Sequence, residues 1–168
     1  MPYVHELCVG RLLGMDVNPG KGPDLTGERA VVEVKFTLLD PRGKYPVAWT
    51  VQDHQMEYGK NGKPAYWALG TYNLESPVKE IRTTDEDALE KLVAKREIWI
   101  VGWNWMQRYS PSKVSGKTAH SEWENIFRYP KRSELPQSEV TVLFDRGKMH
   151  ITTDVDISHF DIKLPQRV

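Results

Sequence analysis

The segment GPDLTGERAVVEVKF, residues Gly22–Phe36, joins a turn to the longest strand-like run in the first half of the chain. Successive side chains of a strand point to opposite faces, so Glu33 and Lys35 share one face. The two valines that flank Glu33 and the phenylalanine after Lys35 then take the other face, where they can pack into a core. Two opposite charges on an apolar strand need a physical reason, because buried charge is costly unless it is paired or bound to a metal.

Asp24 precedes this strand, in a turn that follows Pro23. Asp24, Glu33 and the backbone carbonyl next to Glu33 offer hard oxygen ligands to a Mg²⁺ ion that keeps most of its waters. Lys35 can orient or help to deprotonate a water beside the metal, and its charge can stabilise a developing phosphorane. The pattern predicts phosphodiester hydrolysis, with Asp24 and Glu33 as metal ligands and Lys35 as a further catalytic residue. The alternative is a surface salt bridge between Glu33 and Lys35 on an edge strand.

Pro23-Asp24 followed by Glu33-Val34-Lys35 resembles the PD-(D/E)xK nuclease superfamily, which includes restriction endonucleases, archaeal Holliday-junction resolvases and RecB-type nucleases. The resemblance covers about the first half of the chain. It implies an α/β fold with a restriction-endonuclease-like core, in which a mixed central sheet is flanked by helices. It also implies a metal-dependent endodeoxyribonuclease, with Mg²⁺ as cofactor, Mn²⁺ as a substitute, DNA as partner and a homodimer as the assembly.

Two helices are expected to support this site. Apolar residues spaced as on one helical face predict a helix over Val4–Leu12. An acidic residue on the first helix often lies near the metal in the superfamily, which makes Glu6 a candidate; a solvent-facing glutamate is the alternative. A second helix, Thr50–Tyr58, carries Gln55, which could hold a water or a phosphate at the site. The alternative is a polar glutamine on a short exposed helix.

Composition sets the broad class. The 168 residues are predicted to form one domain, and 23 Lys plus Arg balance 23 Asp plus Glu, which argues against a strongly basic nucleic-acid binder, although local patches matter more than totals. Cys8, the single cysteine, excludes an internal disulfide and fits a reducing compartment. Without a signal-peptide pattern or a bilayer-length apolar run, the chain is expected to be cytoplasmic and not membrane-bound.

Periodicity, capping patterns and Gly or Pro breakers predict the other elements. In chain order they are strands Ala30–Leu39, Pro64–Tyr72 and Val78–Thr83, helix Asp85–Lys95, strand Glu97–Met106, a short helix capped by Ser121 and Glu124, and a hairpin of Val140–Phe144 and Met149–Thr153.

Residues 1–106 are expected to form the nuclease-like core, and residues 107–168 a basic loop and a C-terminal β extension. Basic residues interleaved with aromatic ones predict a phosphate-contacting surface in the loop. A solvated charged loop is the alternative. The candidate contacts are Arg108, Lys113, Lys117, Arg128, Lys131 and Arg132.

Two other functions are open. The chain could be a non-catalytic nucleic-acid- or protein-binding module that uses the basic loop and the tryptophans on one face of the strand Glu97–Met106, although such aromatic stripes are more often packed in a core or interface. It could also be a small-molecule enzyme with a transition metal held by His150, Asp154 and Asp156.

Overall fold

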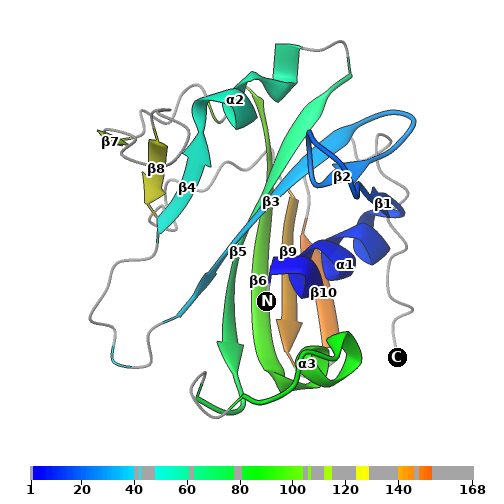
Figure 1. Ribbon diagram of the computed structural model, residues 1–168, viewed down its shortest axis with the longest axis vertical. Helices are drawn as coiled ribbons and strands as arrows, with labels where there is room; N and C mark the ends of the chain where they lie inside the picture. Colours follow the sequence, from blue (N-terminus) through cyan, green and yellow to red (C-terminus); the bar gives the residue numbers. More distant parts are fainter. Residues whose placement is uncertain are drawn as a thin grey trace.

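The computed structural model describes residues 2–39, 42, 48–60, 63–77, 81–103, 106, 112–114, 124–128, 140–145 and 148–152. Figure 1 shows how the elements formed by these residues are arranged. In chain order they are α1 (Pro2–Leu13), β1 (Asp16–Val17), β2 (Leu25–Thr26), β3 (Val31–Leu38), β4 (Ala48–Gln52), α2 (Asp53–Met56), the 3₁₀ turn η1 (Glu57–Lys60), β5 (Ala65–Leu74), α3 (Glu86–Leu92), β6 (Val93–Gly102), β7 (Ser112–Val114), β8 (Glu124–Arg128), β9 (Val140–Asp145) and β10 (Lys148–Thr152).

Among the described residues, seven strands form one mixed sheet in the order β1-β2-β3-β5-β6-β9-β10. Neighbouring strands run antiparallel, apart from β3 and β5, which are parallel. The C-terminal hairpin of β9 and β10 extends this sheet beyond β6 (Figure 1). The fold is thus mixed α/β, and the predicted mixed sheet with flanking helices is confirmed.

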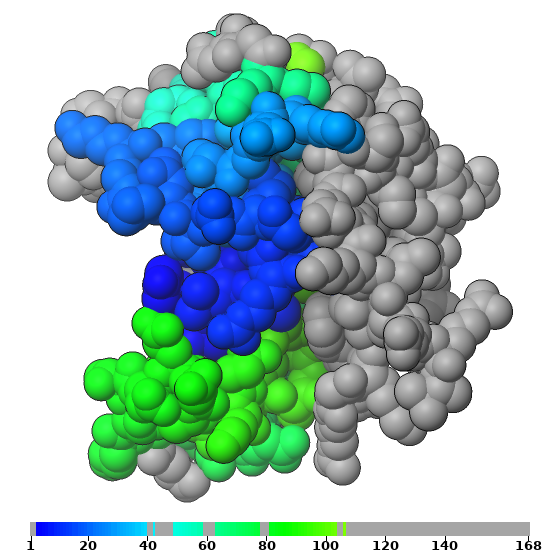
Figure 2. Space-filling view, turned by 90° about the vertical axis from the view of Figure 1, so that its right-hand side faces the viewer, coloured from blue at the N-terminus to red at the C-terminus, as the bar shows by residue number. Residues whose placement is uncertain are grey.

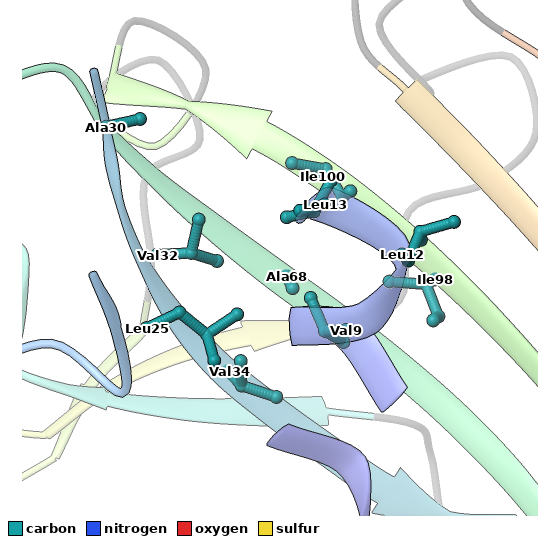
Figure 3. Close-up of a cluster of buried hydrophobic side chains, with 10 residues drawn as sticks. All are labelled: Val9, Leu12, Leu13, Leu25, Ala30, Val32, Val34, Ala68, Ile98 and Ile100. Atoms are coloured by element: carbon teal, nitrogen blue, oxygen red, sulfur yellow. The ribbon is translucent and has the colours of Figure 1, made fainter. Parts of the chain in front are cut away.

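The helix α1 covers one face of the sheet at β3, β5 and β6 (Figure 3). It ends where Gly14 adopts a left-handed conformation (φ 65°) and Met15 N–H donates to the Gly10 carbonyl at 2.9 Å. Its apolar face joins the even-numbered side chains of β3, as the alternation in the sequence predicts. The buried members of this cluster are Val9, Leu12, Leu13, Leu25, Ala30, Val32, Val34, Ala68, Ile98 and Ile100.

A second, three-stranded antiparallel sheet in the order β4-β8-β7 meets the opposite face of the main sheet through β4. Trp49 and Val51 of β4 pack against Trp67 of β5 and Trp99 of β6 in a second buried cluster. The Trp49 indole Nε1–H donates to the Gly70 carbonyl at 2.8 Å, which fixes β4 to the main sheet through a buried hydrogen bond. Apolar packing and this bond together hold the elements that follow β4 over the odd-numbered face of β3.

A buried polar link ties α1 to β6 and α3. His5 is 2% exposed, and its Nδ1 accepts from Arg96 Nε at 3.2 Å, while its ring stacks on Phe36 with centroids 4.2 Å apart. The guanidinium of Arg96 also donates to both carboxylate oxygens of Glu90. Burial, reinforced by the charge of Arg96, lowers the pKa of His5 to about 3, so the imidazole is neutral at physiological pH.

Five sequence predictions of secondary structure are wrong within the described residues. The predicted strand Glu97–Met106 ends at Gly102, and residues 103 and 106 are helical. Residues 50–52 belong to β4, because Val51 fills the second core, and the helix starts at Asp53. Residues 81–83 form no strand, whereas residues 93–95 pair with β5 instead of extending α3, so β6 runs over Val93–Gly102. Residues 124–128 pair with β4 as β8 and form no helix. At residues 50–52, 93–95 and 124–128, long-range pairing outweighs a local pattern.

The sequence also predicts the order helix, hairpin with Asp24, Glu33 strand, helix and buried strand. It is confirmed by α1, the β2–β3 reversal, β3, α2 and β5, and the C-terminal hairpin is confirmed by β9–β10. In the part of the chain that the structure describes, no helix has the length and apolar character needed to cross a bilayer.

Candidate metal-dependent active site

The hairpin register brings Asp24 to the strand that carries Glu33. Leu25 pairs with Val32 in the antiparallel β2–β3 ladder, so the next position outward sets Asp24 opposite Glu33. The backbone ladder ends there, and the next hydrogen bond to β3 comes from the side chain of Asp24, whose Oδ2 accepts the backbone N–H of Val34 at 2.8 Å. The predicted approach of Asp24 to the Glu-x-Lys strand is therefore what the structure has.

Glu33 is 3% exposed, and its two carboxylate oxygens have different surroundings. Oε1 lies 2.8 Å from Lys35 Nζ and accepts from Gln55 Nε2 at 2.7 Å. Oε2 is buried and has no hydrogen-bond partner. A buried carboxylate oxygen without a partner is costly, so this atom is the one at which a cation would be stabilising. A surface salt bridge, the alternative interpretation of the Glu33–Lys35 pair, does not describe a carboxylate this deeply buried.

The acids of this cluster are electrostatically coupled. Burial raises the pKa of Glu33 to about 7. The charge of Lys35 opposes this shift and the negative charge of Asp24 adds to it, while hydrogen bonds from Lys35 and from the Asp24 backbone also oppose it. Burial also raises the pKa of Glu6 on α1, with a second contribution from Asp24 and an opposing one from Lys35. Glu6 thus lies within electrostatic reach of both groups and is half-buried. Asp24 and Glu33 beside one lysine leave an excess of negative charge.

Gln55 reaches this cluster from α2, on the face opposite α1. Its Oε1 accepts the backbone N–H of Gln52 at 2.9 Å, just before the helix begins. That bond orients the carboxamide so that its NH₂ group faces Glu33 Oε1. The sequence placed Gln55 near the site to hold a water or a phosphate; in the structure it holds Glu33 itself. The structure therefore brings together Asp24, Glu33, Lys35 and Gln55, whereas Glu6 is linked to this cluster only through its charge interactions with Asp24 and Lys35.

The donor set fits a hard divalent cation. Among the described residues, no three His, Cys, Asp or Glu side chains are grouped closely enough to bind an ion by themselves. Mg²⁺ needs fewer, because it usually binds one or two carboxylates and keeps several waters. Asp24 and the free Oε2 of Glu33 supply two carboxylates. The carbonyl of Val34 is a third oxygen on this edge, because the N–H and C=O of one strand residue point to the same side and its N–H faces Asp24.

Sequence reasoning missed Asn18, whose carboxamide makes three hydrogen bonds in the loop that ends at Asp24. The Asn-Pro-Gly sequence indicated a turn there. The available signal was the asparagine at the first turn position, a residue that commonly bonds its own loop.

The predicted phosphate-contacting residues are only partly described. Lys113 lies in β7 and Arg128 in β8, the two strands that pair in the second sheet, and only the backbone of these strands is described. Arg108, Lys117, Lys131 and Arg132 lie outside the described residues.

The tryptophan face is core. Trp99 is 3% exposed and meets Trp49 edge to face with centroids 5.7 Å apart, so it presents no surface for a base to stack on. Trp103 is half-buried against the same cluster, and residue 105 is outside the described part. Of the predicted metal-binding tail, His150 lies in β10, and Asp154 and Asp156 lie outside the described residues.

The surface is hollowed at α1, between the lighter blue segment that contains β1 and β2 and the green α3 (Figure 2). A cavity of about 450 Å³ lies at the start of α1, lined among others by Tyr3, Ile81 and Leu89. Neither the clustered residues nor Glu6 line this cavity, which is mostly apolar in character. The chemistry of the cluster therefore does not depend on it.

Comparison of the chain with protein-family models, curated proteins and solved structures gives no match.

Proposed function

We propose that the protein is a Mg²⁺-dependent nuclease that hydrolyses DNA phosphodiester bonds at the Asp24–Glu33–Lys35 cluster. One observation carries the proposal: Glu33 is buried, one of its oxygens is held by Lys35 and Gln55, and the other faces no partner beside a second carboxylate. A purely structural ion pair gains nothing from leaving that oxygen unsatisfied, whereas a metal ligand must keep one free.

Asp24 Oδ1, Glu33 Oε2 and the Val34 carbonyl are the atoms that would hold the ion. A bound divalent cation polarises a phosphoryl oxygen and makes an attached water a stronger acid. The positive charge of the ion would be balanced, because two carboxylates, Asp24 and Glu33, lie near a single ammonium group.

The side chains of the chain itself would perform the remaining tasks. The Lys35 ammonium, fixed by Glu33 Oε1, orients the attacking water and stabilises negative charge that grows on the phosphoryl group. Gln55 keeps Glu33 Oε1 occupied, which directs Oε2 to the ion. Glu6 adds a carboxylate from α1 on the side of Asp24. The water oxygen bonds to phosphorus, one P–O ester bond breaks, and the water protons pass to the leaving alkoxide and to solvent.

The test is cleavage of plasmid, duplex and forked oligonucleotides in Mg²⁺ or Mn²⁺ by the wild type and by the variants Asp24→Asn, Glu33→Gln and Lys35→Ala. Each variant should lose about 100-fold or more in rate, as expected when a charge-stabilising group is removed from a catalytic site. Matched controls are Asp87→Asn and Lys95→Ala, which remove exposed charges on α3 and β6 and should cleave like the wild type. Cleavage that survives Lys35→Ala, or a wild type inert on all substrates with both metals, contradicts the proposal.

DNA contact by the basic loop and assembly into a homodimer belong to the same proposal. A duplex has two strands, and an enzyme that cuts both commonly works as a symmetric pair. Light scattering of the purified protein tests the dimer. The salt dependence of DNA binding, measured with Lys113→Ala and Arg128→Ala variants, tests the basic contacts, since each lost phosphate contact lowers the slope of log K against log salt by about one.

A further inference from the structure

The loop between β1 and β2 spans Asn18 to Asp24 and is built to hold one conformation. It contains Gly20 and Gly22, and Gly22 has φ 108°, a conformation that other residues rarely adopt. Such a glycine-rich loop has a high conformational entropy in the unfolded chain, so specific bonds are needed to order it. The bonds that the structure provides come mainly from Asn18.

Asn18 uses both ends of its side chain on the loop. Its Nδ2 donates to the carbonyls of Lys21 and Pro23, each at 3.0 Å, and its Oδ1 accepts the N–H of Gly20 at 3.1 Å. The backbone N–H of Asn18 donates to the Asp24 carbonyl at 2.7 Å and closes the loop. Only a carboxamide can donate to two carbonyls from Nδ2 and accept an N–H at Oδ1. An aspartate would place an acceptor oxygen against both carbonyls.

These bonds end at the residue whose side chain matters for the site. The backbone N–H of Asn18 donates to the Asp24 carbonyl, and its Nδ2 donates to the carbonyl of the preceding residue. Asp24 Oδ2 accepts the Val34 N–H. The main chain of Asp24 is thereby fixed on one side by Asn18 and its carboxylate on the other by β3. We propose that Asn18 is a positioning residue that holds the Asp24 carboxylate against the Val34 N–H, where it can serve as a metal ligand. The metal-binding part of this inference rests on the proposed function.

The Val34 amide gives a direct readout that needs neither metal nor substrate. Its N–H donates to Asp24 Oδ2, so its hydrogen-exchange rate reports where that carboxylate lies. The Val31 amide, which donates to the Pro64 carbonyl at 3.0 Å on the other edge of β3, is an internal reference for the intact strand.

The experiment measures amide exchange by NMR, and Mg²⁺ affinity by calorimetry, for the wild type, Asn18→Ala, Asn18→Asp and the control Lys21→Ala. Asp24→Ala marks the exchange rate of a Val34 amide without its partner. We expect both Asn18 variants to lose protection at Val34 on the order of tenfold, with Val31 unchanged, because a bond to a charged acceptor is lost. Their Mg²⁺ dissociation constants should rise about tenfold or more, as for other groups that orient metal ligands. Lys21→Ala should match the wild type in both measurements, because only its exposed side chain changes.

Unchanged Val34 protection in Asn18→Asp overturns the inference, whether or not Mg²⁺ binds. If the Asn18 variants lose Val34 protection but the wild type binds no Mg²⁺, the placement of Asp24 by Asn18 is supported and the proposed function is overturned. The two failures are therefore distinguishable.

Discussion

Replacement of Glu33 by glutamine should change how the stability of the metal-free protein depends on pH. Burial holds the pKa of the folded Glu33 at about 7, against 4.5 for an ordinary glutamate. The folded state therefore binds a proton that the unfolded chain has released between these values. This contribution to stability is fully present below pH 4.5 and is lost as the pH rises through about 7.

The size of the effect follows from the two pKa values. At about 1.4 kcal/mol for each tenfold change in the acidity constant, the ionised Glu33 destabilises the metal-free protein by roughly 3 kcal/mol at pH 8. Glutamine has nearly the same shape but does not ionise. At low pH, the free energies of unfolding of the variant and the wild type should differ by a constant amount. As the pH rises to 8, this difference should shift in favour of the variant by roughly 3 kcal/mol.

The assay is urea denaturation in EDTA at pH 5, 6, 7 and 8. The free energy of unfolding of the variant minus that of the wild type is the quantity to follow, since titrating groups outside this coupled cluster, such as His5, cancel in the difference. Saturating Mg²⁺ at pH 8 should stabilise the wild type and leave Glu33→Gln unaffected, because binding to the folded state alone stabilises it. Parallel pH curves for the two proteins would refute the assignment of Glu33 as a buried carboxyl that is strained in the absence of a cation.

Two further predictions concern the link between α1 and the sheet. His5→Gln keeps a hydrogen-bond acceptor for Arg96 but cannot titrate. Neutral His5 contributes stability that is present above pH 6.5 and is lost as the pH falls toward about 3, so between pH 7 and pH 4 the free energy of unfolding of the wild type should fall by on the order of 3 kcal/mol more than that of the variant. Urea denaturation measures both, and equal losses would contradict the burial of a neutral imidazole. Gly70→Ala places a methyl group on the ring of Phe36, so we expect a loss of about 1–3 kcal/mol in the free energy of unfolding; Phe36→Leu should recover part of it in the double variant, and strictly additive losses would rule out this clash.

Much of the site could be predicted from the sequence because its parts are local. The period-two alternation of residues 31–38 separates Glu33 and Lys35 from the valines that pack under α1, and it requires no knowledge of the partner strands. Gly27, which follows Asp24, marks a reversal that returns the chain along β3. A hairpin joins segments close in sequence, so the proximity of Asp24 and Glu33 follows from a short-range argument.

What could not be predicted depends on pairing between distant segments. Thr50 and Asp53 have the spacing of a capping box, and nothing local reveals that residues 48–52 pair with residues 124–128. In the same way, the strand character of residues 93–95 depends on their pairing with β5 and β9. The His5–Arg96 bond joins residues 91 positions apart, a separation at which sequence patterns carry no information about contact.

The second sheet, which the sequence does not predict, is the reason that Gln55 reaches Glu33. The helix α2 has only four residues, and Met56 is its one contact with the second core among the described residues, so its position depends largely on β4. It follows directly from β4, and β4 is anchored by buried Trp49 and by the bond from its indole to the Gly70 carbonyl. Gly70 stands opposite Phe36 in the parallel β3–β5 ladder, three residues from Glu33 along β3. The anchor and the site thus share one strand, and the carboxamide of Gln55 is held to Glu33 by the same packing that closes the second core.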